Sequence, residues 1–212
     1  MMGLPCETRD SHFNGIYKLI DSGVKEIACL QTIMLKGTVL EEDSYVKKHG
    51  IKSKKRVLPS CCGTYQILGK EIEVVEFDEI IIGNADLSFD DYLNCRKLHL
   101  IIMIFHNTRL LQPIYLYLDH YKINRSEIIK SLYHSNDKGL VEILNQFLKA
   151  TKNELVDNLS DIKKMSKSFE EITSNKIFRS LSISLYFKKK KIKQALHKAL
   201  NKVITDNMDS NS

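Results

Sequence analysis

The feature that most constrains the fold is a helix followed at once by a buried strand. Apolar residues recur at helical spacing after Thr8, which we expect to cap the helix, and Gly23 should end it. Glu26–Leu35 (EIACLQTIML) is then a short apolar run without helical caps, which is typical of a buried strand. Helix and strand make half of a parallel βαβ unit, and the strand before the helix is absent or reduced to residues 1–2. Because a parallel strand needs neighbours joined by crossovers, we expect the rest of the sheet to lie elsewhere.

The middle of the chain predicts a small antiparallel element. Arg56–Pro59 and Thr64–Leu68 are typical of short extended pieces, and Ile72–Ile82 of a longer strand or a strand pair. Gly69–Lys70 predicts a two-residue type II′ turn, because glycine comes first. Lys52–Lys55 is expected to be a polar connector.

The second half of the chain predicts helices. Ser88 is expected to cap a helix from Phe89 to about Phe105, with Asp91 placed for a capping box. Leu87 and Tyr92 are spaced as a hydrophobic staple across that start. Further helices are expected over residues 41–48, 110–121, 140–155, 163–172 and 176–204, and over one more segment that Asn124 caps with Glu127 three residues on.

Charge does not decide the function. The net charge is +6, with basic clusters at Lys47–Arg56 and Lys188–Lys191 and an acidic stretch at Glu71–Asp91 between them. Solvated faces explain such runs best, although a basic total permits an anionic partner. Only Tyr186 and Phe187 accompany a basic run, so there is no strong nucleic-acid signal.

Cysteine and histidine spacing indicates no metal site. There is no paired CxxC and no CxxxCxxC, and the seven histidines have no metal-ligand spacing. The odd cysteine count and the absence of a signal peptide predict reduced thiols in the cytoplasm. Adjacent Cys61 and Cys62 are more typical of a structural role than of a nucleophile. The longest apolar run, Leu98–Phe105, is far shorter than the roughly 20 residues of a membrane span.

The order of segments over about residues 1–110 resembles radical SAM proteins that carry an N-terminal cobalamin-binding domain. Gly3–Thr8 (GLPCET), the helix, and the strand ending in Gly37–Thr38 resemble late units of the radical SAM partial barrel. The stretch from RVLPSCCGTYQILGK to NCRKLHL resembles the segment that follows that barrel. The family turn usually has glycine where Cys6 stands, and at the end of the next strand proline usually precedes the Gly-Thr pair, where this chain has Lys36. The cluster-binding CxxxCxxC is absent from this chain.

The resemblance implies a site at the barrel mouth. The residues it places beside S-adenosylmethionine or the substrate are Gly3, Leu4, Pro5, Glu7, Thr8, Gly37 and Thr38. It assigns no catalytic residue and no metal ligand to this chain. The complete enzyme would use S-adenosylmethionine, a 4Fe-4S cluster and, in cobalamin-dependent members, cobalamin. None of these is expected to bind this chain alone, because the chain lacks the cluster ligands. The missing N-terminal half is its expected partner.

The expected fold class is therefore α+β and mostly helical. Residues 1–50 would be the remnant of the partial barrel, 51–86 a small β element, 87–204 a helical region and 205–212 a disordered tail. Two functions remain open: a C-terminal fragment or subunit of a radical SAM enzyme, or a non-catalytic helical module. The module would bind a protein partner or an anionic surface through the basic stripe of the last helix.

Overall fold

The computed structural model describes residues 1–158, 160–161 and 189–208. Its first helix, α1 (Arg9–Asp21), begins with a reciprocal cap. Thr8 Oγ1 accepts from the Ser11 amide at 3.1 Å, and the Thr8 amide donates to Ser11 Oγ at 2.9 Å. Gly23 follows the helix with φ +84°, a left-handed conformation that favours glycine. The predicted cap and stop of this helix are therefore confirmed.

The segment after α1 is not the regular buried strand that we expected over Glu26–Leu35. Within the part of the chain that the structure describes, it makes two isolated bridges, one parallel between Met2 and Gln31 and one antiparallel between Ile33 and Ile80. Leu30 and Leu35 are 58% and 59% exposed, so the run is not buried as a whole. Because Met2 alone pairs with this segment in parallel, the pairing is a single bridge, and the residues on either side of Gln31 form no regular strand.

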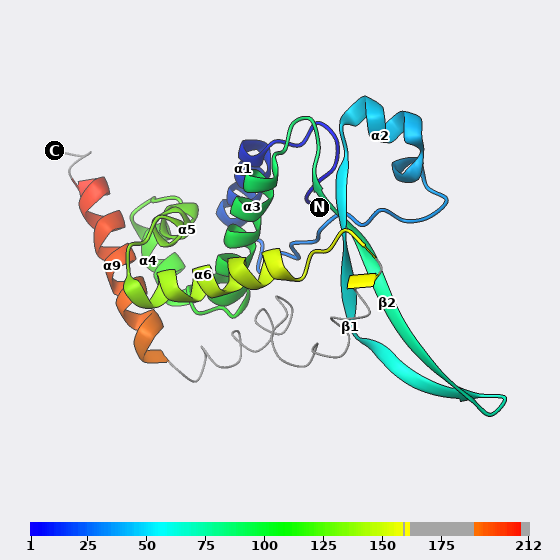
Figure 1. The fold of residues 1–212 in the computed structure, drawn as a ribbon. Helices are drawn as coiled ribbons and strands as arrows, with labels where there is room; N and C mark the ends of the chain where they lie inside the picture. Colours follow the sequence, from blue (N-terminus) through cyan, green and yellow to red (C-terminus); the bar gives the residue numbers. More distant parts are fainter. Residues whose placement is uncertain (159, 162–188, 209–212) are drawn as a thin grey trace.

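A long hairpin replaces the predicted short pieces. Strands β1 (Lys52–Ile67) and β2 (Lys70–Gly83) pair antiparallel, so Lys52–Lys55 belongs to a strand and not to a connector. The register shifts between Val57 and Cys62, where residues 58–61 stand opposite Glu76 alone. Figure 1 shows the far half of this hairpin extending away from the helices.

The hairpin turn lies one residue earlier than predicted. Its two loop residues are Leu68 and Gly69, with φ +52° and +75°, and not Gly69–Lys70. Positive φ at both central positions is typical of a type I′ turn, so the predicted type II′ turn is wrong. Ahead of the hairpin, a short 3-10 turn η1 (Val39–Glu41) and helix α2 (Asp43–His49) occupy the region of the short helix expected there.

The best-marked helix begins as predicted. In α3 (Phe89–Ile101) Ser88 Oγ accepts from the Asp91 amide at 3.1 Å, and the Ser88 amide donates to the Asp91 carboxylate at 3.2 Å. A π-helical turn, η2 (Ile102–Asn107), continues it past the expected end at Phe105. Leu87 and Tyr92 are fully buried in one cluster, as a staple requires.

The remaining helices are α4 (Gln112–His120), α5 (Ser126–Tyr133), α6 (Lys138–Asn153) and α9 (Lys189–Met208). Asn124 does not cap α5, which begins two residues later. Its first amide donates instead to the Asp21 carboxylate at the end of α1, at 2.7 Å. The helix expected over Lys163–Ile172, and residues 176–188 of the last predicted helix, lie outside the described residues. Thr205–Met208 are helical and not a frayed tail.

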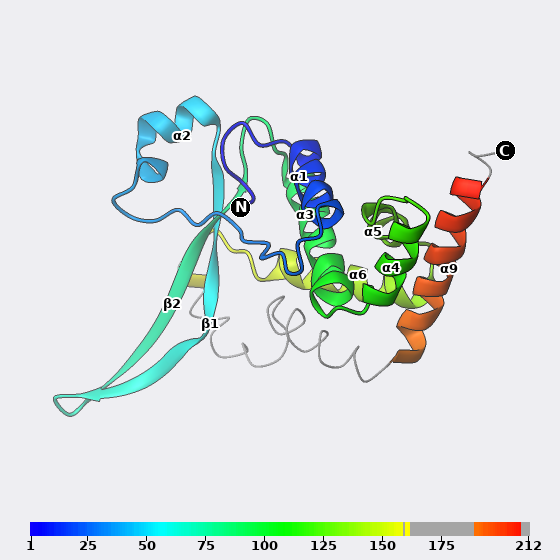
Figure 2. The same ribbon diagram turned by 180° about the vertical axis from the view of Figure 1, so that it is seen from behind.

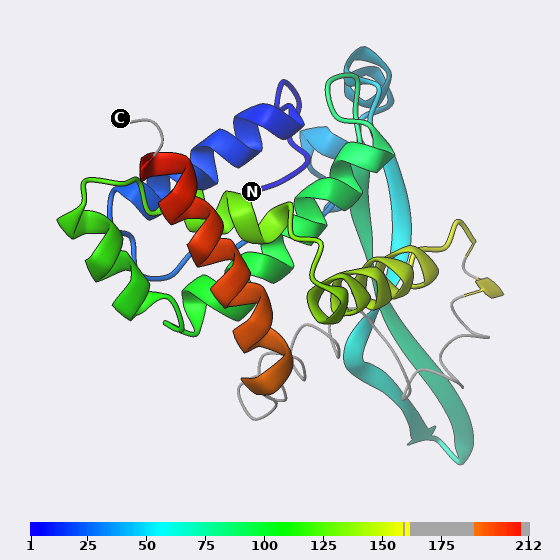
Figure 3. The ribbon, with the colours of Figure 1, turned by 90° about the vertical axis from the view of Figure 1, so that its left-hand side faces the viewer.

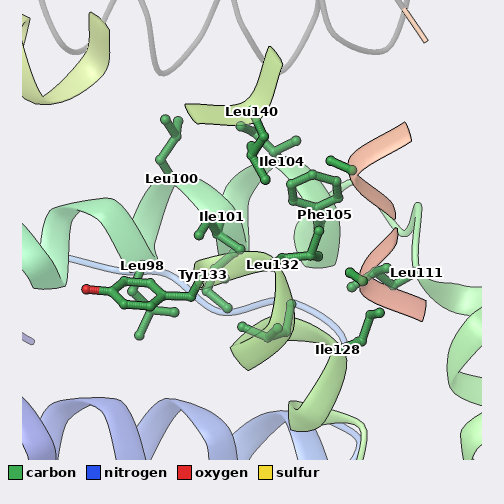
Figure 4. Close-up of a cluster of buried hydrophobic side chains, with 14 of the residues drawn as sticks. Leu98, Leu100, Ile101, Ile104, Phe105, Leu111, Ile128, Leu132, Tyr133 and Leu140 are labelled. Carbon is green, nitrogen blue, oxygen red and sulfur yellow. The ribbon is translucent and has the colours of Figure 1, made fainter. Parts of the chain in front are cut away.

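Two hydrophobic clusters hold these elements together. The main core cluster lies between α1, α3, η2, α4, α5, α6 and α9. Figure 3 shows the arrangement of the helices, and Figure 4 shows part of the cluster. This cluster is built around Leu98, Leu100, Ile101, Ile104, Phe105, Leu111, Ile128, Leu132, Tyr133 and Leu140. The hairpin-base cluster joins the hairpin to α3 and contains Met2, Ile80, Ile82, Leu87, Tyr92, Leu93, Cys95 and Leu155. The chain is thus α+β, with a hairpin attached to a helical body.

Two glycines should respond to alanine in opposite directions. A Cβ on Gly83 would lie 2.9 Å from the Leu87 carbonyl oxygen, so the backbone must shift. We expect Gly83→Ala to lower the free energy of unfolding by about 1–3 kcal/mol. Gly15 lies inside α1 with no atom within 4 Å of such a Cβ, and Gly15→Ala should raise it by about 0.5–1 kcal/mol. Urea unfolding of both variants checks the pair, and equal effects would contradict it.

Candidate functional site

The Gly3–Thr8 turn folds around one of its own carboxylates. The Gly3 amide donates to Glu7 Oε2 at 2.9 Å, and Gly3 has φ +101°. Asn84, at the end of β2, donates from Nδ2 to the carbonyls of Gly3 (3.3 Å) and Leu4 (3.0 Å). The turn is therefore held from inside by Glu7 and from outside by the hairpin.

Cys6 occupies the left-handed region in this turn. Its φ is +66°, its amide donates to Asp86 Oδ2 at 3.2 Å, and its thiol is exposed and free. A side chain in this conformation is strained, and glycine is the residue that adopts it freely. The backbone at position 6 is thus suited to the glycine that the radical SAM turn usually carries there.

Glu7 begins a chain of hydrogen bonds into the protein, which we call the Glu7–His12–His99 relay. Glu7 Oε1 lies 2.8 Å from His12 Nδ1, and His12 Nε2 lies 2.8 Å from His99 Nε2. The two rings are 8% and 0% exposed. Helix α1 positions His12, and α3, which packs against α1, brings His99 to it.

The charges of the relay follow from its surroundings. Burial would raise the pKa of Glu7, but hydrogen bonds from His12 and the Gly3 amide outweigh it and hold that pKa below its usual value. Burial lowers the pKa of His99 well below its ordinary value, and the nearby charges of Arg96 and His12 act in the same direction. Glu7 is therefore a carboxylate and His99 a neutral imidazole near neutral pH.

These charges fix where the protons lie. His12 Nδ1–H donates to Glu7, so a neutral His12 must accept at Nε2 from His99 Nε2–H. A protonated His12 would donate to both neighbours, and His99 would then carry its proton on Nδ1. His99 Nδ1 is buried and has no hydrogen-bond partner within the described chain. The relay therefore joins the Glu7 carboxylate of the turn to a buried imidazole on α3, where the chain of hydrogen bonds ends.

The thiol beside the relay is not a nucleophile. Cys95 lies one helical turn before His99 and is fully buried. Burial raises its pKa to about 12, helped by the negative charges of Glu7 and Asp91. The protonated thiol is inert at neutral pH. Among residues 1–158, 160–161 and 189–208, no group of three or more His, Cys, Asp or Glu side chains is arranged to hold a metal ion.

The structure brings only some of the predicted site residues together. Gly3, Leu4, Pro5, Glu7 and Thr8 form the turn, but the Glu7 carboxylate points inward to His12. Gly37 and Thr38 lie in a separate loop before η1. Their recorded hydrogen bonds go to Glu41 and Leu35.

Sequence reasoning missed His12, Asn84 and His99. The histidine spacing matches no metal site, and the contact that joins His12 to His99 spans 87 positions. His106, seven residues after His99, bonds elsewhere: its ring contacts Tyr115 Oη at 2.9 Å and the Val24 carbonyl at 3.0 Å. The one local signal is that His99 follows Cys95 by four residues on the buried face of α3.

A second polar cluster lies where the hairpin meets the helices, and we call it the Arg56 cluster. Arg56 is nine-tenths buried; its Nη1 donates to Gln31 Oε1 at 3.0 Å. The guanidinium lies 3.7 Å from the carboxylates of both Asp78 and Glu154. Gln31 in turn donates to the hydroxyl of buried Tyr92. These bonds tie β1, β2, α3 and the end of α6 to the segment after α1.

Lowering the pH should destabilise the fold through His99. An unfolded histidine titrates near pH 6.5, whereas burial keeps His99 neutral well below that value in the folded state. Below about pH 6.5 the unfolded state therefore binds more protons, and the free energy of unfolding falls by up to about 1.4 kcal/mol per pH unit. In His99→Phe this dependence should be shallower, and urea unfolding between about pH 5 and pH 7.5 measures it.

Part of the slope should remain in that variant. Burial also lowers the pKa of His106, which acts with the same sign. The matched control, His120→Phe, replaces an exposed imidazole on α4 and is expected to keep the wild-type pH profile. An unchanged slope in His99→Phe would show that His99 does not couple folding to pH.

Other predicted features are resolved only in part. Cys6, Cys29, Cys61 and Cys95 are free thiols. Lys188 lies outside the described residues, and for Lys189–Lys191 only the helical backbone of α9 is described. Of the helices that the structure describes, none has the length and apolar content to cross a bilayer.

Comparison with known proteins adds no assignment. No family model matches the chain, and a search of curated proteins finds no significant match. Function is therefore proposed from the residues, their geometry and the resemblance given above.

Proposed function

We propose that this chain is the C-terminal portion of a radical SAM enzyme, working with an N-terminal half on the same or a separate polypeptide. It would supply late units of the partial barrel and a helical region beside the substrate. The N-terminal half would bind the 4Fe-4S cluster and S-adenosylmethionine, which together generate a radical in this family. Alone, the chain would not be catalytically competent.

One observation carries the proposal: the parallel bridge between Met2 and Gln31, with α1 as its crossover helix. The Met2 amide donates to the Leu30 carbonyl and the Thr32 amide to the Met2 carbonyl, both at 2.9 Å. Parallel segments joined through a helix are the unit from which βα barrels are built. Ligand sites in such barrels lie at the carboxyl ends of the parallel strands.

The predicted site residues follow those ends. Gly3–Thr8 comes directly after Met2, and Gly37–Thr38 comes after the segment that pairs with Met2. Among the residues that the structure describes, the two loops make no hydrogen bond to one another, because Gly37–Thr38 bonds within its own loop to Leu35 and Glu41. The left-handed backbone of Cys6 supports the proposal further, because the family turn usually carries glycine there.

The relay gives the turn a defined role in this proposal. His12 and the Gly3 amide hold the ionised Glu7 carboxylate within the turn. The chain's own residues thus shape the loop and join it through His12 to the buried ring of His99. Its residues do not fit a cluster, because CxxxCxxC is absent and the described part contains no metal-ligand group, so we assign the cluster to the N-terminal half. Free cysteines suit a reducing compartment, and we place the enzyme in the cytoplasm.

Co-expression tests the proposal. The N-terminal half is sought as a CxxxCxxC-containing reading frame upstream of this gene. Expressed together, the two halves should co-purify, show the absorbance of an iron–sulfur cluster and bind S-adenosylmethionine. This chain alone should show no cluster absorbance and should not bind S-adenosylmethionine.

A variant of the N-terminal half, with alanine at its cluster cysteines, is the control. It should lose the cluster absorbance and still co-purify, which separates assembly from cofactor binding. If the two halves do not associate and the N-terminal half gains no activity from this chain, the proposal is wrong.

The second function left open by the sequence gains no observation from the structure. A helical module that binds a partner or an anionic surface would depend on Lys188–Lys191, whose side chains lie outside the described part. Were it correct, binding to a polyanion would weaken steeply as salt concentration rises.

A further inference from the structure

The far half of the hairpin, residues 63–76, which we call the arm, has one apolar face. Side chains alternate across a strand, and the pairs Gly63–Val74, Tyr65–Ile72 and Ile67–Lys70 lie on the same face. A Cβ on Gly63 would lie 3.5 Å from the Tyr65 ring, as expected for neighbours on one face. Tyr65, Ile67, Ile72 and Val74 are 56%, 50%, 40% and 37% exposed.

The opposite face of the arm is polar over residues 64–73, and Val75, which pairs with Cys62, is its one apolar position within the arm. This face carries the cross-strand pairs Thr64–Glu73 and Gln66–Glu71. Alternating apolar and polar faces are typical of an antiparallel sheet that packs against something on one side. A two-stranded hairpin alone is at best marginally stable in water, so covering the apolar face would stabilise the arm.

The charges on the apolar face point to its occupant. Along β2 the face runs Lys70, Ile72, Val74 and Glu76, so a cation and an anion flank two aliphatic side chains. If two arms meet face to face and antiparallel about a two-fold axis, Lys70 of one lies opposite Glu76 of the other. Ile72 then lies opposite Val74, and the contact is complementary to itself, as an isologous interface must be.

We propose that the apolar face of the arm is the contact between two copies of this chain. Figures 1 and 2 show the arm extending well beyond the helical body, which leaves both bodies clear of such a contact. The face is small for a specific interface, so we expect a dissociation constant on the order of 10–100 µM.

Sedimentation velocity of the full chain, in reductant and over a range of concentrations, tests the contact. The wild type should pass from monomer to dimer as concentration rises. Ile72→Asp should remain monomeric throughout, whereas Thr64→Asp on the polar face should dimerise like the wild type. Far-ultraviolet circular dichroism checks that each variant keeps its fold.

Charge reversal makes the test specific to this geometry. Lys70→Glu and Glu76→Lys each create two like-charge contacts in a two-fold dimer and should weaken self-association by about tenfold. An equimolar mixture of the two variants should associate again, because every contact in the mixed dimer pairs a lysine with a glutamate.

Three results would overturn the inference: a wild type that stays monomeric, a dimer that tolerates Ile72→Asp, or a mixture that does not recover. A wild type that stays monomeric would mean that a different protein covers the apolar face. None of them bears on the radical SAM proposal, since this experiment uses the chain alone and the co-expression experiment does not depend on the arm.

Discussion

Replacing Phe105 with alanine is expected to lower the free energy of unfolding by about 3–5 kcal/mol. Phe105 is fully buried in the π-helical turn η2 and lies in the main core cluster (Figure 4). Truncation removes the transfer free energy of the ring and leaves a cavity. Helices α3, α5 and α9 all contribute side chains to this cluster, and a close-packed core relaxes only partly into a new cavity.

Urea unfolding measures the effect, with Leu116→Ala as the matched control. Leu116 is on α4 and 62% exposed, so its truncation should change the free energy of unfolding by less than about 0.5 kcal/mol. A loss below about 1 kcal/mol in Phe105→Ala would mean that the main core cluster is not the chief source of stability.

The sequence predicts those features whose cause is local. Thr8 caps α1 and Ser88 caps α3 because each side chain bonds an amide three residues away. Gly23 ends α1 because its left-handed conformation costs glycine little. In each case the residues that decide the structure are neighbours in the sequence, so pattern and structure agree.

The errors come from interactions between distant residues. Glu26–Leu35 has the composition of a strand, but a strand is defined by its partners, and here they supply isolated bridges to Met2 and Ile80. The hairpin is longer than predicted because Lys52–Lys55 is polar yet pairs with residues 79–83. Asn124 has a capping residue type, but Asp21 of α1 takes that role for α5.

In the candidate site, too, local interactions could be predicted and interactions between distant residues could not. The resemblance places Gly3–Thr8 in one turn, which is local, and the structure agrees. Asn84, which follows β2, bonds the turn directly, and His99 on α3 is linked to it through His12. Neither residue has a signature in sequence spacing. Gly37 and Thr38 would meet the turn only across a sheet edge, and the single rung between Met2 and Gln31 does not bring them into contact with it.

Replacing Arg56 with alanine is expected to lower the free energy of unfolding by about 3 kcal/mol. Its guanidinium donates to Gln31 at 3.0 Å and lies 3.7 Å from the carboxylates of Asp78 and Glu154. Truncation removes a buried positive charge from two carboxylates that burial keeps from water, and it breaks the bond to Gln31. Because these residues come from four parts of the chain, we expect the hairpin to loosen from the helical body.

Lys54→Ala is the matched control, since Lys54 lies on the same strand two residues away. Its ammonium pairs with Asp157 at 3.1 Å, but both side chains are partly or largely exposed, so the expected loss is below about 1 kcal/mol. Urea unfolding compares the two variants, and hydrogen exchange of the β1 and β2 amides locates the loss. Similar small effects in both variants would mean that the Arg56 cluster contributes no more than a surface ion pair, and that the hydrophobic residues of the hairpin-base cluster alone hold the hairpin in place.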